Sequence, residues 1–117
     1  MSISRLSIVV FPESTKSWTA RSLERDIAAI GRTAEAAVES LLGIAEAHIA
    51  FDTRHGRSPL SGFSAAPRPY WTAFASAETA VPPREVTRVE SKSQVRYLVG
   101  MVKQHPIIGR HQVAQIA

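Results

Sequence analysis

The sequence contains no cysteine and no apolar run long enough to cross a membrane. Without cysteine the chain forms neither disulfide bonds nor thiolate metal sites, a composition that fits a cytoplasmic protein. A membrane-spanning helix needs about 20 consecutive apolar residues, and no segment approaches that length. The segment Met1–Arg5 is not a cationic stretch followed by a long apolar one, so we expect no secretory signal and a cytoplasmic location.

Patterns typical of catalytic sites are also scarce. The glycines are isolated, so the sequence has no glycine-rich phosphate loop. The histidines are too widely spaced to predict a metal site: His48, His55, His105 and His111. We therefore expect no metal, no cofactor and no catalytic residue.

The carboxylates of the chain suggest one catalytic alternative, a nuclease. A two-metal nuclease needs several carboxylates that converge on its cations. Glu24 and Asp26 flank Arg25 in a predicted bend, and Glu35 and Glu39 lie on the polar side of a predicted helix. Polar residues are expected at both places without any catalytic role, so a residual nuclease remains only an alternative.

The length and composition predict one folded domain. The chain has 117 residues, of which 44% are hydrophobic and 21% are charged, which is typical of a globular protein with a single core. The segment Leu6–Phe11 is apolar and rich in β-branched residues, which predicts a strand buried on both faces. A turn at 12–16 leads to alternating residues at 17–23, which predict a second, antiparallel strand, and 27–31 predicts a short third one.

A helix from Ala34 to about Ala50 follows these strands. Thr33 is its expected N-cap, and Glu35 in the first turn suits the helix dipole. Its apolar residues recur at spacings of three and four: Ala37, Val38, Leu41, Leu42, Ala45 and Ile49. The predicted fold class is therefore α+β, with a three-stranded antiparallel sheet and one main helix.

The middle of the chain, residues 51–83, is rich in proline and glycine and predicts an irregular segment that ends in a linker at 75–83. It contains an aromatic cluster, Tyr70, Trp71 and Phe74. Aromatic side chains pack against something, so this cluster either buries itself on the sheet or contacts a partner. We name these three residues as candidate partner-binding residues.

The last segment, residues 84–117, carries the whole positive charge of the chain. Residues 1–83 have eight basic and eight acidic residues, whereas the last segment has two acidic residues, Glu85 and Glu90. Its six basic residues are the candidate nucleic-acid-binding residues: Arg84, Arg88, Lys92, Arg96, Lys103 and Arg110. Localised positive charge favours nucleic acid or an acidic protein surface, although a solvated tail has the same composition.

The structure of this last segment is open at the sequence level. Residues 86–89 fit a strand, and 91–104 fit a helix better than a strand, although Gly100 weakens the helix. A final short helix would follow Pro106. This order loosely matches a ribbon-helix-helix DNA-binding unit, and the alternatives are a tail that completes the sheet or swaps into a second subunit.

The first half of the chain resembles the HicB-like antitoxin family. The resemblance lies in Leu23-Glu24-Arg25-Asp26-Ile27, in Gly31 and Thr33, and in Glu35-Ala36-Ala37, and it covers residues 5–50. It implies a partial ribonuclease-H-like fold without catalytic carboxylates. It also implies binding to a small HicA-type RNase toxin, and in many members to operator DNA through a separate segment.

These observations predict a non-enzymatic binding module, an antitoxin or a relative of one. We expect an α/β core at 1–50, a loop segment at 51–83 and a basic tail at 84–117 for oligomerisation or binding. The expected partners are a HicA-type toxin and further copies of this chain, with operator DNA as the alternative.

Overall fold

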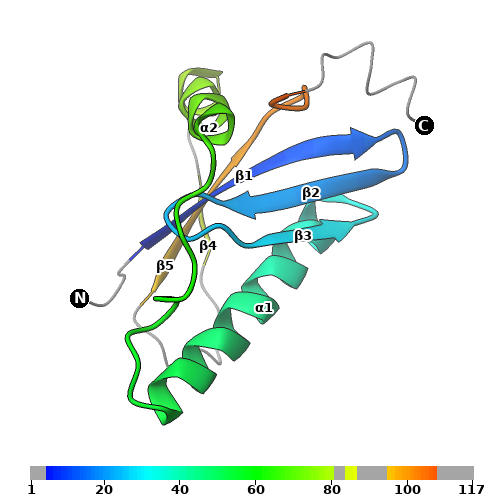
Figure 1. Cartoon of the computed structure of the whole chain (residues 1–117). Helices are drawn as coiled ribbons and strands as arrows, with labels where there is room; N and C mark the ends of the chain where they lie inside the picture. Colours follow the sequence, from blue (N-terminus) through cyan, green and yellow to red (C-terminus); the bar gives the residue numbers. More distant parts are fainter. Residues whose placement is uncertain (1–4, 81–83, 87–94, 108–117) are drawn as a thin grey trace.

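The computed structural model describes residues 5–80, 84–86 and 95–107, which form one mixed sheet and two helices (Figure 1). The elements are β1 (Arg5–Ser14), β2 (Ser17–Ser22), β3 (Ala28–Gly31), α1 (Ala34–Arg54), α2 (Arg68–Ala80), β4 (Arg84–Val86) and β5 (Arg96–Met101). The strand order is β3-β2-β1-β5-β4. β1 and β5 are parallel, and the other neighbouring strands are antiparallel. No helix in the described part of the chain is long and apolar enough to span a membrane.

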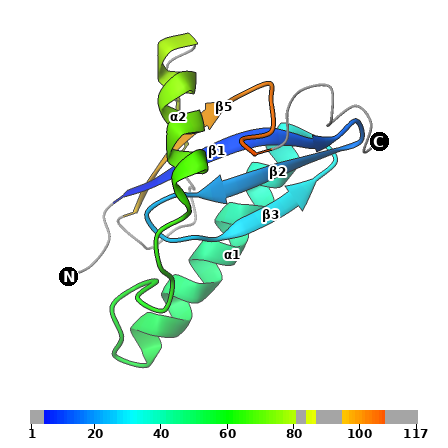
Figure 2. The ribbon, with the colours of Figure 1, turned by 45° about the horizontal axis from the view of Figure 1, so that its top comes forward.

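The two helices lie on opposite faces of the sheet (Figures 1 and 2). Side chains alternate between the faces of a strand, so β1 supplies both cores. Leu6, Ile8 and Val10 pack with α1 in the larger core. Val9 and Phe11 pack with α2 in the smaller one. The expected burial of this strand on both faces is confirmed.

The hairpin and the third strand are also confirmed. Ala20 faces the α1 core, with Trp18 partly buried against it, whereas Thr19 and Arg21 line the opposite face. The bend before β3 is held by Ser22, whose hydroxyl accepts from the amide of Ile27 at 3.1 Å. β1 continues to Ser14, so it takes in part of the turn expected at 12–16, which is found at 15–16.

The predicted helix is confirmed and extends four residues further, to Arg54. The Thr33 hydroxyl accepts from the amide of Ala36 at 3.0 Å, as expected of an N-cap. The extra turn reaches Asp52, a buried residue whose carboxylate accepts from the amide of Leu60 at 2.8 Å. This contact ties the following loop to the end of α1. All six predicted apolar positions of the helix are buried.

The irregular segment expected at 51–83 is wrong over 51–54, where α1 continues, and over 68–80, where α2 occupies Arg68–Ala80. The linker expected at 75–83 is therefore wrong over 75–80. Tyr70, Phe74 and Ala77 recur at spacings of four and three and are buried on one side of the helix. Pro69 lies in the first turn, where an amide hydrogen has no helical partner. The many prolines and glycines nearby hid this short amphipathic pattern.

The helix expected at 91–104 is wrong over 96–101, where β5 lies between β1 and β4. Tyr97 and Val99 enter the α1 core, and Leu98 packs on the α2 side. A strand buried on both faces is a continuous apolar run, which also matches a helical pattern. The sheet therefore has five strands rather than three, and it is mixed rather than antiparallel.

The strand expected at 86–89 is found at Arg84–Val86, and the two ranges share only Val86. β4 pairs with β5 through its backbone, with Glu85 opposite Leu98. The remaining part of that expectation, 87–89, and the final short helix lie outside the described residues.

Candidate functional site

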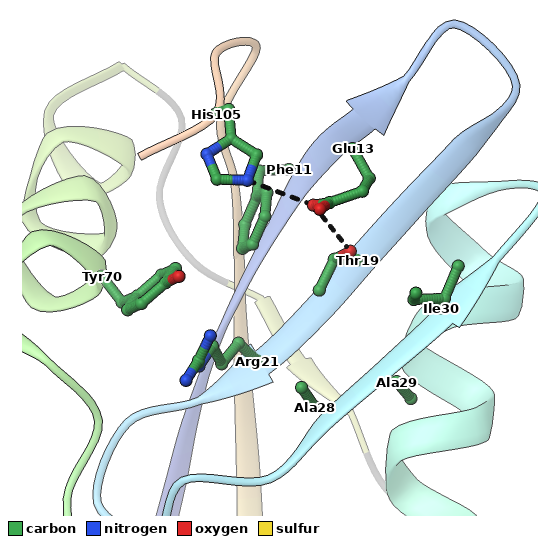
Figure 3. A pocket seen from close by; sticks show the side chains of 9 residues that line it. All are labelled: Phe11, Glu13, Thr19, Arg21, Ala28, Ala29, Ile30, Tyr70 and His105. Carbon is green, nitrogen blue, oxygen red and sulfur yellow. Dashed lines mark hydrogen bonds and ion pairs between the residues drawn. The ribbon is translucent and has the colours of Figure 1, made fainter. Parts of the chain in front are cut away.

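A pocket of about 460 Å³ lies on the sheet face that carries α2 (Figure 3). α2 packs against β1 and β5, and the pocket opens beside it over β2 and β3. Five elements or their flanks contribute its lining residues: Phe11, Glu13, Thr19, Arg21, Ala28, Ala29, Ile30, Tyr70 and His105. This size is in the range of ligand-binding clefts, about 300–1,000 Å³.

Aromatic rings form one wall of the pocket. The rings of Phe11 and Tyr70 stack at 5.8 Å between centroids. The ring of His105, which follows β5, meets Phe11 edge-on at 4.8 Å. The His105 side chain is nearly buried. These contacts fix His105 in place, because α2 and β1 already hold the two rings beside it.

The polar side of the pocket centres on the carboxylate of Glu13. Its Oε2 atom lies 3.2 Å from Nε2 of His105. The same oxygen accepts a hydrogen bond from the Thr19 hydroxyl at 3.1 Å. Figure 3 shows these two contacts as dashed lines that join β1, β2 and the segment after β5. Glu13 thus connects three parts of the chain while it remains partly exposed to the pocket.

Arg21 supplies the positive charge of the pocket. Its Nε and Nη2 atoms donate to the two carboxylate oxygens of Asp26 at 2.7 and 2.9 Å. Its guanidinium lies 4.2 Å from the centroid of the Tyr70 ring. The hydrogen bonds to Asp26 raise the pKa of Arg21 above its ordinary value and outweigh the opposing effect of burial. Arg21 therefore stays charged and fixed in orientation.

The hydroxyl, carboxylate and imidazole groups of the pocket meet at Glu13. Residues 5–80, 84–86 and 95–107 contain no group of three His, Cys, Asp or Glu side chains that would hold a metal ion. The pocket offers apolar surface and fixed charges of both signs.

Two of the carboxylates considered for a nuclease, Glu24 and Asp26, bond to residues of the neighbouring strands. Glu24 accepts from the amide of Ser7 at 2.6 Å and from its hydroxyl at 2.7 Å. Asp26 pairs with Arg21. Glu35 and Glu39 are exposed on α1, as expected. Glu24 and Asp26 thus hold the β2–β3 connection in place.

The three residues of the aromatic cluster differ in exposure, and Trp71 is the most exposed of them. Tyr70 and Phe74 are 5% and 8% exposed and pack in the α2 core, so the interpretation that they bury on the sheet holds. Trp71 is 39% exposed, and its indole Nε1 donates to the carbonyl of Ala66 at 3.0 Å. Tyr70 still lines the pocket with its ring.

The six basic residues of the last segment are not brought together in the described structure. Arg96 donates to both carboxylate oxygens of Glu85, at 2.9 and 3.2 Å. Lys103 is exposed after β5. The backbone of Arg84 lies in β4, and Arg88, Lys92 and Arg110 lie outside the described residues. The strand at 96–101 also replaces the first helix of the ribbon-helix-helix alternative.

Sequence reasoning missed the polar residues of the pocket. Alternation along residues 17–23 places Thr19 and Arg21 on one face of the predicted strand. This alternation was the sequence signal that could have led to the polar side of the pocket. Glu13 fell in an expected turn, and His105 has no nearby pattern that points to the sheet. Only the return of β5 beside β1 brings His105 to Glu13.

A larger groove of about 1,080 Å³ lies at the end of β5, between the start of α1 and α2. Val10, Val38, Ala73 and Val102 are among its mainly apolar lining. It borders residues 103–106, close to the point where the described chain ends. We take the smaller pocket as the candidate site because charged side chains in fixed geometry converge there.

Comparison of this chain with protein-family models, with curated proteins and with solved structures finds no significant match.

Proposed function

We propose that this protein is a non-catalytic binding module, a HicB-like antitoxin or a relative, that binds a small HicA-type RNase toxin. The proposal rests on the sequence resemblance over residues 5–50. It is supported by the order β1, β2, β3 and α1, in which three antiparallel strands and a helix follow one another. It places the protein in the cytoplasm, where a toxin that degrades RNA acts.

The open sheet face beside α2 supplies a surface for this contact. It combines an aromatic wall with the fixed charges of Glu13 and Arg21. Protein interfaces combine such an apolar centre with oriented charges, which select the partner. The carboxylates that might have served a nuclease hold the β2–β3 connection instead. We therefore place the contact with the toxin at this pocket.

The test is a binding assay between the purified chain and the small protein encoded beside its gene. Glu13→Lys reverses a charge in the pocket, and we expect it to weaken binding at least about tenfold. Glu35→Lys makes the same change at an exposed position of α1, across the sheet, and should leave binding unchanged. Circular dichroism confirms that both variants fold. If the neighbouring protein does not bind the wild-type chain, the proposal is wrong.

DNA binding stays a prediction from charge alone. If the chain binds DNA, DNA from upstream of its gene should give a gel shift, and this shift should weaken steeply as the salt concentration rises. Substitution of Lys103 and Arg96 by glutamine should weaken that shift further, and a shift that is independent of salt would contradict the prediction.

A further inference from the structure

In the described part of the chain, β3 forms one edge of the sheet and β4 forms the other. β3 pairs with β2 on one side and has no neighbouring strand on the other. The amide of Ser22 donates to the carbonyl of Ile27 at 2.9 Å, which fixes the phase of the hydrogen bonds between these strands. Bonded pairs alternate in an antiparallel ladder. Ala29 and Gly31 therefore bond towards β2, and the backbone groups of Ala28 and Ile30 point outward.

The loop before α2 marks where this free edge begins. The amide of Asp26, which has the same phase as Ala28 and Ile30, donates to the carbonyl of Ser64 at 2.7 Å. The edge before β3 is thus occupied by the loop. Within the described structure, the outward groups of Ala28 and Ile30 remain as two donors and two acceptors for an added strand.

The edge is short, at four residues, but its side chains do not protect it from pairing. Exposed edge strands usually carry charges, proline or a bulge. Residues 27–31 contain no charged residue and no proline. Ile30 is 64% exposed beside the pocket, and Ala28 is exposed on the same face. A strand with this composition is suited to be covered rather than solvated.

We propose that β3 pairs antiparallel with β3 of a second copy of this chain, across a two-fold axis at Ala29. In this register Ala28 of each copy faces Ile30 of the other, and both residues have outward-pointing backbone groups. Two such pairs make four hydrogen bonds and join the two sheets into one. The apolar side chain of Ile30 then lies against Ala28 of the second copy, which covers it.

The pattern of outward groups favours a second copy as the occupant. These groups recur at Ala28 and Ile30, so a two-fold axis at Ala29 sets each donor of one copy opposite an acceptor of the other. The strand itself is neutral, so the two copies bring no like charges opposite each other.

The interface is small, which determines how it should be measured. Stable complexes usually bury at least about 1,200 Å², more than a pair of four-residue strands provides. We therefore expect a dimer that forms with increasing protein concentration. Sedimentation equilibrium of the full chain over a wide concentration range should show a mass that rises from one chain towards two.

Charged substitutions on the edge test the site directly. Ala28→Lys and Ile30→Lys place a charge on exposed positions and should weaken the dimer at least about tenfold. Ala47→Lys makes the matched change at an exposed position of α1 and should leave the dimer unchanged. A mass of one chain at all concentrations would overturn the proposal, as would a dimer that both edge variants retain.

Amide hydrogen exchange gives a second readout that depends on the hydrogen-bond phase alone. The amides of Ala28 and Ile30 should exchange more slowly as the protein concentration rises. The amides of Ala29 and Gly31, which bond to β2, should not change. Equal behaviour of all four amides would contradict the proposed edge. Ala28 and Ile30 also line the pocket proposed for the toxin, but the two tests stay distinguishable, because the dimer is measured on the chain alone.

Discussion

Gly31, just before α1, and Gly43, inside α1, differ in the space around them. A side chain at Gly31 would place its Cβ 2.4 Å from the amide nitrogen of Ala37 and 2.8 Å from the carbonyl carbon of Ala36. Both atoms belong to the backbone of the first helical turn. At Gly43, inside α1, the same added atom would meet nothing within 4 Å. Gly31 therefore lets the helix approach β3, whereas Gly43 has no such role within the described residues.

Alanine at these two positions should change stability in opposite directions. Gly31→Ala should destabilise the fold by about 1–3 kcal/mol, because the backbone of α1 must move away from β3. Gly43→Ala should stabilise it by about 0.5–1 kcal/mol, because alanine loses less entropy in a helix. Urea unfolding of the two variants measures both changes, and a change of the same sign in both would contradict this account.

Arg21 allows a test of geometry against charge. Arg21→Lys keeps the positive charge but loses the two-pronged contact with Asp26 and the stacking on Tyr70. We expect a loss of about 1–2 kcal/mol in the free energy of unfolding. Arg32→Lys, at an exposed position after β3, is the control and should have almost no effect. Equal stability of the two variants would mean that charge alone matters at position 21.

At the scale of elements, β5 is held to α1 by a hydrogen bond over a long sequence distance. The Tyr97 hydroxyl donates to Oε2 of Glu46 at 2.8 Å, while its ring is buried in the α1 core. Tyr97→Phe keeps the ring and should cost about 1 kcal/mol in urea unfolding. Phe63→Leu, at the edge of the same core, provides a comparison for small losses of packing. No measurable cost in Tyr97→Phe would show that water replaces the bond.

The contact between β4 and β5 predicts a dependence on pH. Hydrogen bonds from Arg96, and then its charge, lower the pKa of Glu85 below its ordinary value of 4.5. Folding thus favours the ionised carboxylate, and this contribution is complete above pH 4.5 and is lost as the pH falls through the lower folded value. An NMR titration of the Glu85 side chain should give a midpoint below 4.5. In Arg96→Gln the midpoint should return towards 4.5, and an unchanged midpoint would exclude Arg96 as the cause.

The elements that could be predicted from the sequence are those with a local signal. β2 shows alternation, and α1 has both a cap at Thr33 and a regular apolar stripe. β5 could not be distinguished from a helix, because its partners β1 and β4 lie on either side of it and α1 and α2 cover its faces. α2 was missed because its apolar side is only three residues long within a proline-rich stretch.

The candidate site was harder to predict than the fold, because most of its residues come together only through tertiary contacts. Thr19 and Arg21 share a face by local alternation, but Tyr70 and His105 reach them only through tertiary packing. The sequence showed three aromatic residues together, although the helix sends Tyr70 and Phe74 inward and Trp71 outward. Local composition identified the cluster and could not assign its direction.

At the scale of the whole molecule, the two cores depend on the same central strands. β1 and β5 each supply side chains to the α1 core and to the α2 core. A chain that ends at residue 83 lacks β4 and β5, so both cores lose a wall. We expect such a chain to show no cooperative unfolding by urea, whereas the full chain unfolds in one transition. A cooperative transition in the shortened chain would show that β1–β3 and the helices form a stable unit by themselves.

The pairing of β1 with β5 also has a consequence for how the protein is made. β1 leaves the ribosome early, and its apolar residues 6–11 need a parallel neighbour that is synthesised about 90 residues later. At about 5–20 residues per second, that edge stays uncovered for several seconds at least. The nascent chain therefore carries β1 with one edge unpaired through most of its synthesis.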